Sequence, residues 1–245
     1  MVGKVQQRFN SINSTNSYAT ELLSKTRPIE GTAIIADHQT EGKGQFDSIW
    51  ESNSNENILM SIILYPEILE VNSQYMITCF VSLAVSNVIG KILPEKAVKI
   101  KWPNDIFCGD SKVAGILIQN TLKGKKLKSS VIGIGINVNQ KKFPSNVPNA
   151  TSIQMEHGHE FDLEEIRELV FEELEKRYRD LKENREKVRR EYIQNLYGIG
   201  IEKNFKRLNG LNFKGRIIGI DNYGFLIIES AYGKEKFDVK QVIYS

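Results

Sequence analysis

The chain has 245 residues, enough for one large domain with a sizeable core or for one domain with a small appendage. Hydrophobic residues make up 40% and charged residues 26%, which are the proportions of an ordinary globular protein and exclude a disordered or fibrous chain. The net charge of +3 is too small, over this length, to indicate a nucleic-acid or membrane partner.

The cysteines and the N-terminus indicate a cytoplasmic protein. Neither Cys79 nor Cys108 has a partner at the spacing of a metal site, and two cysteines do not make a disulfide framework. Residues 1–10 carry Lys4 and Arg8 instead of the apolar stretch of a signal peptide, and no apolar run approaches the length of a membrane span. We therefore expect a protein of the reducing cytoplasm without a membrane partner.

Apolar and alternating segments predict the strands of a sheet. These strands are expected at 32–37, 58–64, 98–101, 113–119 and 130–137. Between the second and the third, residues 74–93 place apolar side chains at helical spacing, with Asn72 or Ser73 as the N-cap. This pattern predicts a buried amphipathic helix.

The last third of the chain changes character twice. Residues 162–196 are strongly charged, with apolar positions at helical spacing, and predict a helix whose charges form a solvated face. Gly198 and Gly200 end this helix. The segments 215–220 and 225–229 flank a turn, and short strands with glycine turns in so small a region indicate a small β-barrel.

Two lysines and a carboxylate surround a tight turn in the middle of the chain. The run KWPND at 101–105 predicts strand, turn and strand, because proline cannot donate to a sheet ladder and Asn-Asp favours a turn. A Gly-Asp pair at 109–110 predicts another reversal before the next strand. Lys101 and Lys112 are then presented at neighbouring loop ends near Asp105, as an anion-binding cluster. The alternative is a polar hairpin with solvated lysines.

A glycine-rich loop at 39–50 follows the first clear strand. Gly42 and Gly44 flank Lys43, so backbone amides can approach an anion closely while the lysine adds a charged donor. The alternative is a flexible exposed loop. No Gly-Lys pair of this chain is followed by Ser or Thr, so a nucleotide would not bind through a Walker A sequence.

The run Gly-Ile-Gly-Ile-Asn at 133–137 begins like a dinucleotide fingerprint, but Val138 takes the place of the third glycine and no helix-forming stretch follows. We therefore reject a Rossmann site. The glycines suit close packing around a ligand, and Asn137 either pairs with a base edge or forms a turn. Trp50 and Trp102 lie in the segments described above, where an indole supplies core packing or stacks on a purine.

Six short motifs, taken in chain order, resemble those of biotin protein ligases. They are Ser14-Thr15-Asn16, Gln39 with the loop 42–50, KWPND at 101–105, Lys112 with Ala-Gly-Ile-Leu at 114–117, Gly-Ile-Gly-Ile-Asn at 133–137, and Ala-Thr-Ser at 150–152. The resemblance covers nearly the whole chain. It implies an α+β fold: a catalytic domain at 1–197, with a mixed β-sheet and packed helices as in class II synthetases, and a C-terminal SH3-like β-barrel at 198–245.

The resemblance implies a two-step reaction with biotin and ATP as substrates and Mg²⁺ as cofactor. The biotin carboxylate attacks the α-phosphate of ATP to give biotinyl-5'-AMP and pyrophosphate, and a lysine of a biotin carboxyl carrier domain then attacks this mixed anhydride. Attack of an anion on a phosphate needs cations where charge builds up. Lys112, Lys43 and magnesium would supply them.

By resemblance, each motif also supplies ligand contacts. Catalytic roles are assigned to Lys112, Lys43 and Asp105. The biotin ring system is expected to bind Ser14, Thr15, Asn16 and Gln39, and the adenine is expected to face Trp50 and Asn137. Further contacts are expected from Gly42, Gly44, Gln45, Lys101, Asn104, Gly115, Ile116 and Gly135. No protein-built metal site is predicted, because His157 and His159 lack a third ligand.

The loop departs from the family pattern. Many members have arginine at the position of Gln45 and a basic residue near Ser48, so this loop contributes one certain cation, Lys43. A glutamine can donate a hydrogen bond, but it lacks the permanent charge and the bidentate fork of arginine. Asp47 stands where the family often has glycine, and nothing in the sequence explains it.

Other functions are weighed against this one. Lipoate and octanoate ligases share the fold, but their basic triple-glycine segment ending in histidine is absent here. A non-catalytic nucleotide-binding or carrier-binding module could follow from the changes at Gln45 and Ser48, yet an intact Lys112 loop is unusual in a pure binder. Ser14 already belongs to the catalytic motif, so we expect no winged-helix domain before it and no nucleic-acid partner. The sequence leaves a homodimer open.

Overall fold

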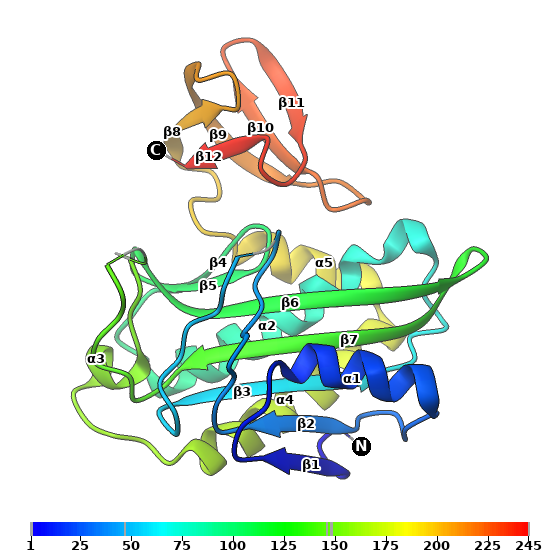
Figure 1. Ribbon diagram of the computed structural model, residues 1–245. Coiled ribbons are helices and arrows are strands. Elements are labelled where there is room, and N and C mark those ends of the chain that lie inside the picture. The colour runs from blue at the N-terminus through cyan, green and yellow to red at the C-terminus, as the bar shows by residue number, and fades with distance from the viewer. Residues whose placement is uncertain (1, 47, 146, 148, 245) are drawn as a thin grey trace.

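The computed structural model describes residues 2–46, 48–145, 147 and 149–244, whose strands form two sheets (Figure 1). The larger sheet has seven strands in the order β1-β2-β3-β7-β6-β5-β4. Their bounds are β1 (Gln6–Phe9), β2 (Ala33–Ala36), β3 (Asn57–Leu64), β4 (Val98–Lys101), β5 (Asp105–Cys108), β6 (Ser111–Lys123) and β7 (Lys126–Asn137). Strand β1 runs parallel to β2 and the other neighbours are antiparallel, so the expected mixed sheet is confirmed.

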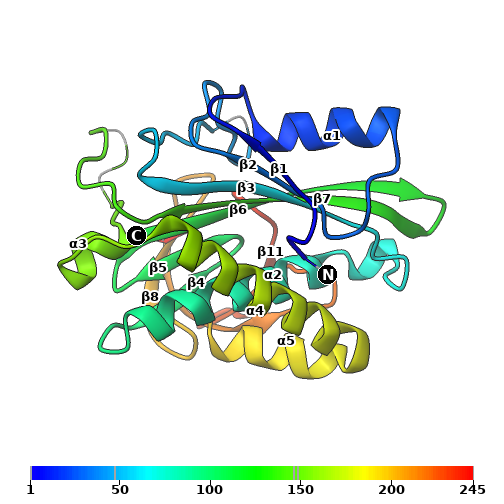
Figure 2. The same ribbon diagram turned by 90° about the horizontal axis from the view of Figure 1, so that it is seen from below.

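Helices cover both faces of this sheet (Figure 2). Helix α1 (Thr15–Lys25) lies on one face, and α2 (Tyr75–Ile92), α4 (Leu163–Glu183) and α5 (Arg185–Gln194) lie on the other. The short elements are η1 (Val71–Ser73) and α3 (Ile153–His157). Every residue of the central strand β3 is buried, which explains its near-continuous apolar sequence.

Helix α2 is the central helix of the core. Together with η1 it forms the segment Val71–Ile92, which is long and apolar enough to cross a membrane, and this corrects the expectation that no such run exists. However, 67% of the apolar window is buried inside the protein, where α2 packs against α4 and α5. Its high apolar content is therefore that of a core helix that is mostly buried in the protein.

Several elements differ from the sequence-based expectation. Helix α1 was not predicted, because few of its residues are apolar; the Ser14 side chain caps it by accepting from the N–H of Ser17. The charged segment 162–196 forms two helices instead of one. The break falls at Asn184, whose side chain accepts from the N–H of Lys187 and caps α5.

The smaller sheet is antiparallel, with strands in the order β11-β10-β9-β8-β12. Their bounds are β8 (Glu202–Arg207), β9 (Asn212–Ile220), β10 (Leu226–Ser230), β11 (Gly233–Phe237) and β12 (Val242–Tyr244). The expected strand 215–220 lies within β9, and the expected strand 225–229 overlaps β10, which begins at Leu226. The turn between them packs on the part of the chain that carries the larger sheet: Trp102 Nε1 donates to the Gly224 carbonyl at 2.9 Å. Gly224 has φ +92°, and a Cβ there would lie 2.2 Å from the Tyr75 ring.

The Trp102 hydrogen bond should stabilise the docking of the smaller sheet. Trp102 is 4% exposed, so Trp102→Phe leaves the Gly224 carbonyl without this donor and should lower the free energy of unfolding by at least about 1 kcal/mol. Urea unfolding measures this value. Tyr244→Phe is the matched control, because its buried hydroxyl has no hydrogen-bond partner among the described residues. Equal losses in both variants would contradict the role of the bond.

Candidate active site

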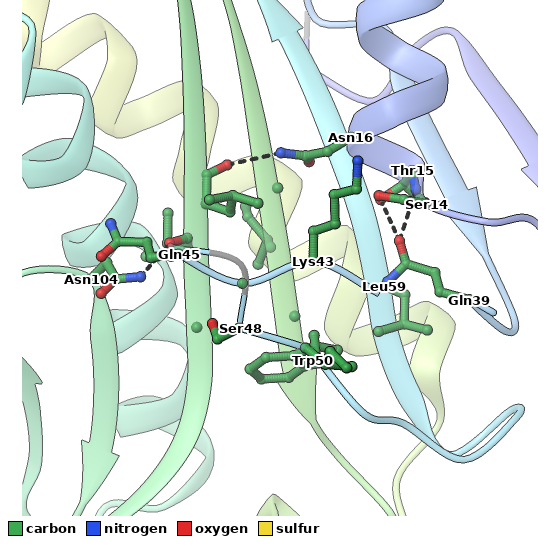
Figure 3. A pocket seen from close by; sticks show the side chains of 18 of the residues that line it. Ser14, Thr15, Asn16, Gln39, Lys43, Gln45, Ser48, Trp50, Leu59 and Asn104 are labelled. Atoms are coloured by element: carbon green, nitrogen blue, oxygen red, sulfur yellow. Dashed lines mark hydrogen bonds between the residues drawn. The ribbon is translucent and has the colours of Figure 1, made fainter. Parts of the chain in front are cut away.

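A cavity of about 180 Å³ lies on the α1 face of the larger sheet (Figure 3). Its walls come from the start of α1, the loop after β2, the turn between β4 and β5, and strands β3, β6 and β7. The predicted site residues that line it are Ser14, Thr15, Asn16, Gln39, Lys43, Gly44, Gln45, Trp50, Asn104, Asp105, Lys112, Gly115, Ile116 and Gly135. Segments far apart in sequence therefore meet in one polar cavity.

One end of the cavity is a buried hydrogen-bond network. Gln39 Oε1 accepts from the backbone N–H of Thr15 at 2.8 Å and from its hydroxyl at 3.1 Å. The Ser61 hydroxyl lies 2.5 Å from Asn16 Oδ1 and 2.8 Å from Thr15 Oγ1, and Asn16 Nδ2 contacts the Leu117 carbonyl at 3.3 Å. This end presents both donors and acceptors. Sequence analysis missed Ser61, whose only signal is a hydroxyl within an apolar strand.

The other end carries the charged pair. Lys112 Nζ lies 2.6 Å from Asp105 Oδ1, and both side chains are about three-quarters buried. The ammonium also lies 5.4 Å from the Trp50 ring centre. Asn104 closes this end. Its side-chain Nδ2 donates to the Ile116 carbonyl at 2.7 Å, and its backbone carbonyl accepts from the Ile116 N–H at 3.0 Å.

A β-bulge aims Lys112 into the cavity. Regular alternation along β6 would place residues 112 and 115 on opposite faces. The register with β5 shifts between Ile106 and Phe107, which pair with Ala114 and Lys112. As a result, Lys112 Nζ reaches within 3.3 Å of the point that a Cβ of Gly115 would occupy. The bulge thus brings the lysine onto the same face as the cavity floor.

Three glycines form the floor on β6 and β7. Gly115 and Gly135 face each other across the strands, and a Cβ on them would lie 2.8 and 2.5 Å from the Trp50 ring. A Cβ on Gly133 would lie 2.3 Å from Asn16 Oδ1. Trp50 Nε1 is buried without a hydrogen-bond partner among the described residues. The glycines therefore let Trp50 and Asn16 lie directly on the sheet.

The structure places three predicted residues outside this cavity. The Lys101 ammonium lies 4.5 Å from the Phe107 ring centre and 5.1 Å from that of Tyr244, and burial lowers its pKa. Gly42 lines a neighbouring cavity, and its carbonyl accepts from the Trp50 N–H at 2.9 Å. Asn137, the third of these residues, is buried at the end of β7. Asp47 lies outside the described residues.

Asn137 uses its amide within the protein. Its Nδ2 donates to the Thr151 carbonyl at 3.0 Å, at the end of β7.

In Figure 3 the Lys43 side chain extends from the loop toward the end of the cavity formed by Thr15 and Asn16. Lys112 is the lysine that pairs with Asp105 in the cavity. Lys43 is a second cation on the rim of the cavity.

Comparison with known proteins identifies the family. Residues 8–137 match the model of the biotin/lipoate A/B protein ligase family. Over 229 residues the chain is 34% identical to the bifunctional ligase/repressor BirA of Bacillus subtilis, covering 92% of this chain and 69% of that protein. The chain belongs to this family. It is also 26% identical over 237 residues to the biotin–acetyl-CoA-carboxylase ligase of Paracoccus denitrificans, covering 94% of this chain and 98% of that protein.

Solved structures of this ligase family share the fold. The biotin protein ligase of Aquifex aeolicus, in complex with biotin and ATP, superimposes with a TM-score of 0.81 at 25% identity. The match covers 99% of this chain and all of that one (100%). Both sheets therefore belong to an arrangement that a biotin ligase is known to adopt.

Proposed function

We infer that this chain is an ATP-dependent biotin protein ligase, which joins biotin to a lysine of a biotin carboxyl carrier domain through biotinyl-5'-AMP. The observation that carries this inference is the polar cavity with a donor-acceptor network at one end and the Lys112–Asp105 pair at the other. Relatives named as biotin–acetyl-CoA-carboxylase ligases match over nearly the whole chain. The Aquifex structure holds biotin and ATP in the same fold.

The two ends of the cavity suit the two ends of biotin. The ureido ring needs donors and acceptors, which the Thr15–Gln39 and Asn16–Ser61 contacts supply. The carboxylate then points toward Lys112. A carboxylate oxygen attacks the α-phosphorus of ATP and pyrophosphate leaves; next, the carrier lysine attacks the carbonyl carbon and AMP leaves. We propose that Lys112 stabilises the negative charge that develops on the phosphate oxygens.

Magnesium fits this site as a companion of ATP. Mg²⁺ in phosphate-transfer sites is held by one or two carboxylates together with phosphate oxygens and water. Asp105 is the only acid among the described residues that line the cavity, and no group of three His, Cys, Asp or Glu side chains is found in the described part of the chain. We propose that Asp105 supplies the protein ligand and that the bound ion neutralises phosphate charge.

We propose the domains 1–197 and 198–245, the second being an SH3-like barrel. The last helix of the larger layer ends at Gln194, and the antiparallel sheet of short strands begins at Glu202. Binding of the carrier domain, a cytoplasmic location and the lack of a nucleic-acid partner stay predictions. The Bacillus relative is named a repressor as well as a ligase, and tight, sequence-specific operator binding by this chain would contradict the last of them.

One assay separates the candidate functions. The protein is mixed with magnesium, ATP and either biotin, lipoate or octanoate, and pyrophosphate exchange and transfer to a carrier domain are followed. We expect exchange with biotin and biotin transfer. Exchange with lipoate or octanoate alone would indicate a lipoate or octanoate ligase. Tight biotin binding without exchange would indicate a non-catalytic module.

Biotin should also order the loop at 41–48. In the described part of this loop, three backbone hydrogen bonds hold a small hairpin: Gly44 N to Ser48 O, Ser48 N to Gln45 O, and Trp50 N to Gly42 O. Its side chains bury little apolar surface, so its opening costs little free energy. Hydrogen exchange measured by mass spectrometry should slow here when biotin binds. Equal protection with and without biotin would count against the prediction.

A further inference from the structure

The backbone of Lys112 is held by a segment that follows the sheet, the bracing segment (149–151). The Lys112 N–H donates to the Asn149 carbonyl at 2.7 Å, and its carbonyl accepts from the Thr151 N–H at 2.9 Å. The two segments form a short parallel bridge. The pairing of β6 with β7 begins only at Ala114, so it does not hold Lys112. The bracing segment therefore replaces a strand partner at this position.

Thr151 anchors the bracing segment. It is 3% exposed, its hydroxyl donates to Glu156 Oε1 at 2.7 Å, and its carbonyl accepts from Asn137 at 3.0 Å. The second carboxylate oxygen of Glu156 accepts from Lys96 Nζ at 2.8 Å. Burial acts to raise the pKa of Glu156, but hydrogen bonds from Lys96 and Thr151 lower this pKa below its usual value. An ionised Glu156 thus holds Thr151 from one side while Asn137 holds it from the other.

We propose that Thr151 and Glu156 are positioning residues for Lys112, an inference that rests on the proposed function. Neither lines the cavity, so they act through the backbone of the lysine. Lys112 must hold its ammonium where charge develops on the phosphate, and misplacing a group by ~1 Å can cost ~10²-fold in rate. This assigns a role to the Ala-Thr-Ser motif at 150–152, which lies outside the cavity.

The test removes one hydroxyl and keeps the volume. Thr151→Val should lower the rate of adenylate formation at saturating biotin and ATP by roughly tenfold. The KM values for both substrates should stay close to those of the unaltered protein, because the substrate contacts remain. Thr151→Ser keeps the hydroxyl and should retain nearly the full rate, whereas Glu156→Ala removes the acceptor of that hydroxyl and should lower the rate as Thr151→Val does.

A matched threonine separates positioning from stability. Thr32 is 2% exposed, and its hydroxyl donates to the Ile29 carbonyl at 2.6 Å, outside the cavity. Thr32→Val therefore removes the same buried group, and it should lower the midpoint of thermal unfolding as much as Thr151→Val does while leaving the rate unchanged. A rate for Thr151→Val equal to that of Thr32→Val would overturn the proposal.

A double variant tests whether Thr151 acts through Lys112. Adding Thr151→Val to Lys112→Ala should leave the residual single-turnover rate unchanged, because the lysine that it positions is gone. Equal losses in both backgrounds would overturn the proposal. A lack of biotin-dependent exchange in the unaltered protein would instead overturn the proposed function, so the two failures are distinguishable.

Discussion

Lys112→Ala should lower the rate of biotinyl-5'-AMP formation by about 10²–10³-fold, the loss typical when one group that stabilises transition-state charge is removed. Lys112 is the cation that the structure pairs with Asp105 inside the cavity, at 2.6 Å. Single-turnover formation of the adenylate from labelled ATP measures this rate. The free energy of unfolding should change by less than this loss of rate corresponds to, because solvent reaches about a quarter of each side chain and screens the pair.

Lys25→Ala is the matched control for this experiment. Lys25 also pairs with an acid, Glu21 at 2.5 Å, but it lies on the exposed face of α1 outside the cavity. Its replacement should leave adenylate formation unchanged. A Lys112→Ala rate equal to that of Lys25→Ala would show that the essential cation lies elsewhere, and Lys43 would then be the next candidate.

Gly133→Ala should weaken biotin binding by about tenfold or more, since each lost hydrogen bond is worth about 0.5–1.5 kcal/mol and 1.4 kcal/mol is tenfold in affinity. The added Cβ would lie 2.3 Å from Asn16 Oδ1. A side-chain amide moves more easily than a central strand, so Asn16 is displaced from Ser61 and Leu117. Isothermal titration calorimetry with biotin measures the change in Kd.

Gly90→Ala supplies the same chemical change without the clash. A Cβ at Gly90, on α2, meets only the Cβ of Val98 at 4.0 Å, an ordinary contact. Biotin affinity should be unaffected, and the free energy of unfolding should rise by up to about 1 kcal/mol, because alanine favours a helix over glycine. Equal biotin affinity in Gly133→Ala and Gly90→Ala would mean that Asn16 does not hold the ring.

Much of the sheet and of the cavity could be predicted from the sequence. Strands such as 58–64 and 130–137 are apolar enough to identify, and proline with Asn-Asp marks the turn that carries Asp105. The missed elements have weaker signals. Helix α1 has too few apolar residues to form an apolar stripe, and only the Ser14 side chain, which accepts from the Ser17 N–H, marks its start.

The residue types of the site can be predicted from the sequence, but the directions in which their side chains point cannot. In the sequence, Lys101 and Lys112 are two lysines near the same turn, and both are expected to contact the ligand. In the structure the rings of Phe107 and Tyr244 hold the first, and Tyr244 lies at the far end of the chain. Contacts across such a separation leave no local pattern to find.

The residues alone were enough to predict the family, the strand core and the available chemistry, which consists of two glycine-rich segments, a lysine-carboxylate pair and a polar N-terminal motif. Which of Lys101 and Lys112 enters the cavity depends on the way the strands pair. Side chains alternate along a strand, so a single skipped residue reverses the face on which a side chain emerges. The shift between Ile106 and Phe107 does this for Lys112, and the bracing segment then fixes its backbone. The first effect depends on the register of the neighbouring strands β5 and β6, and the second on a bridge between Lys112 and Ala150, which lie far apart in the chain.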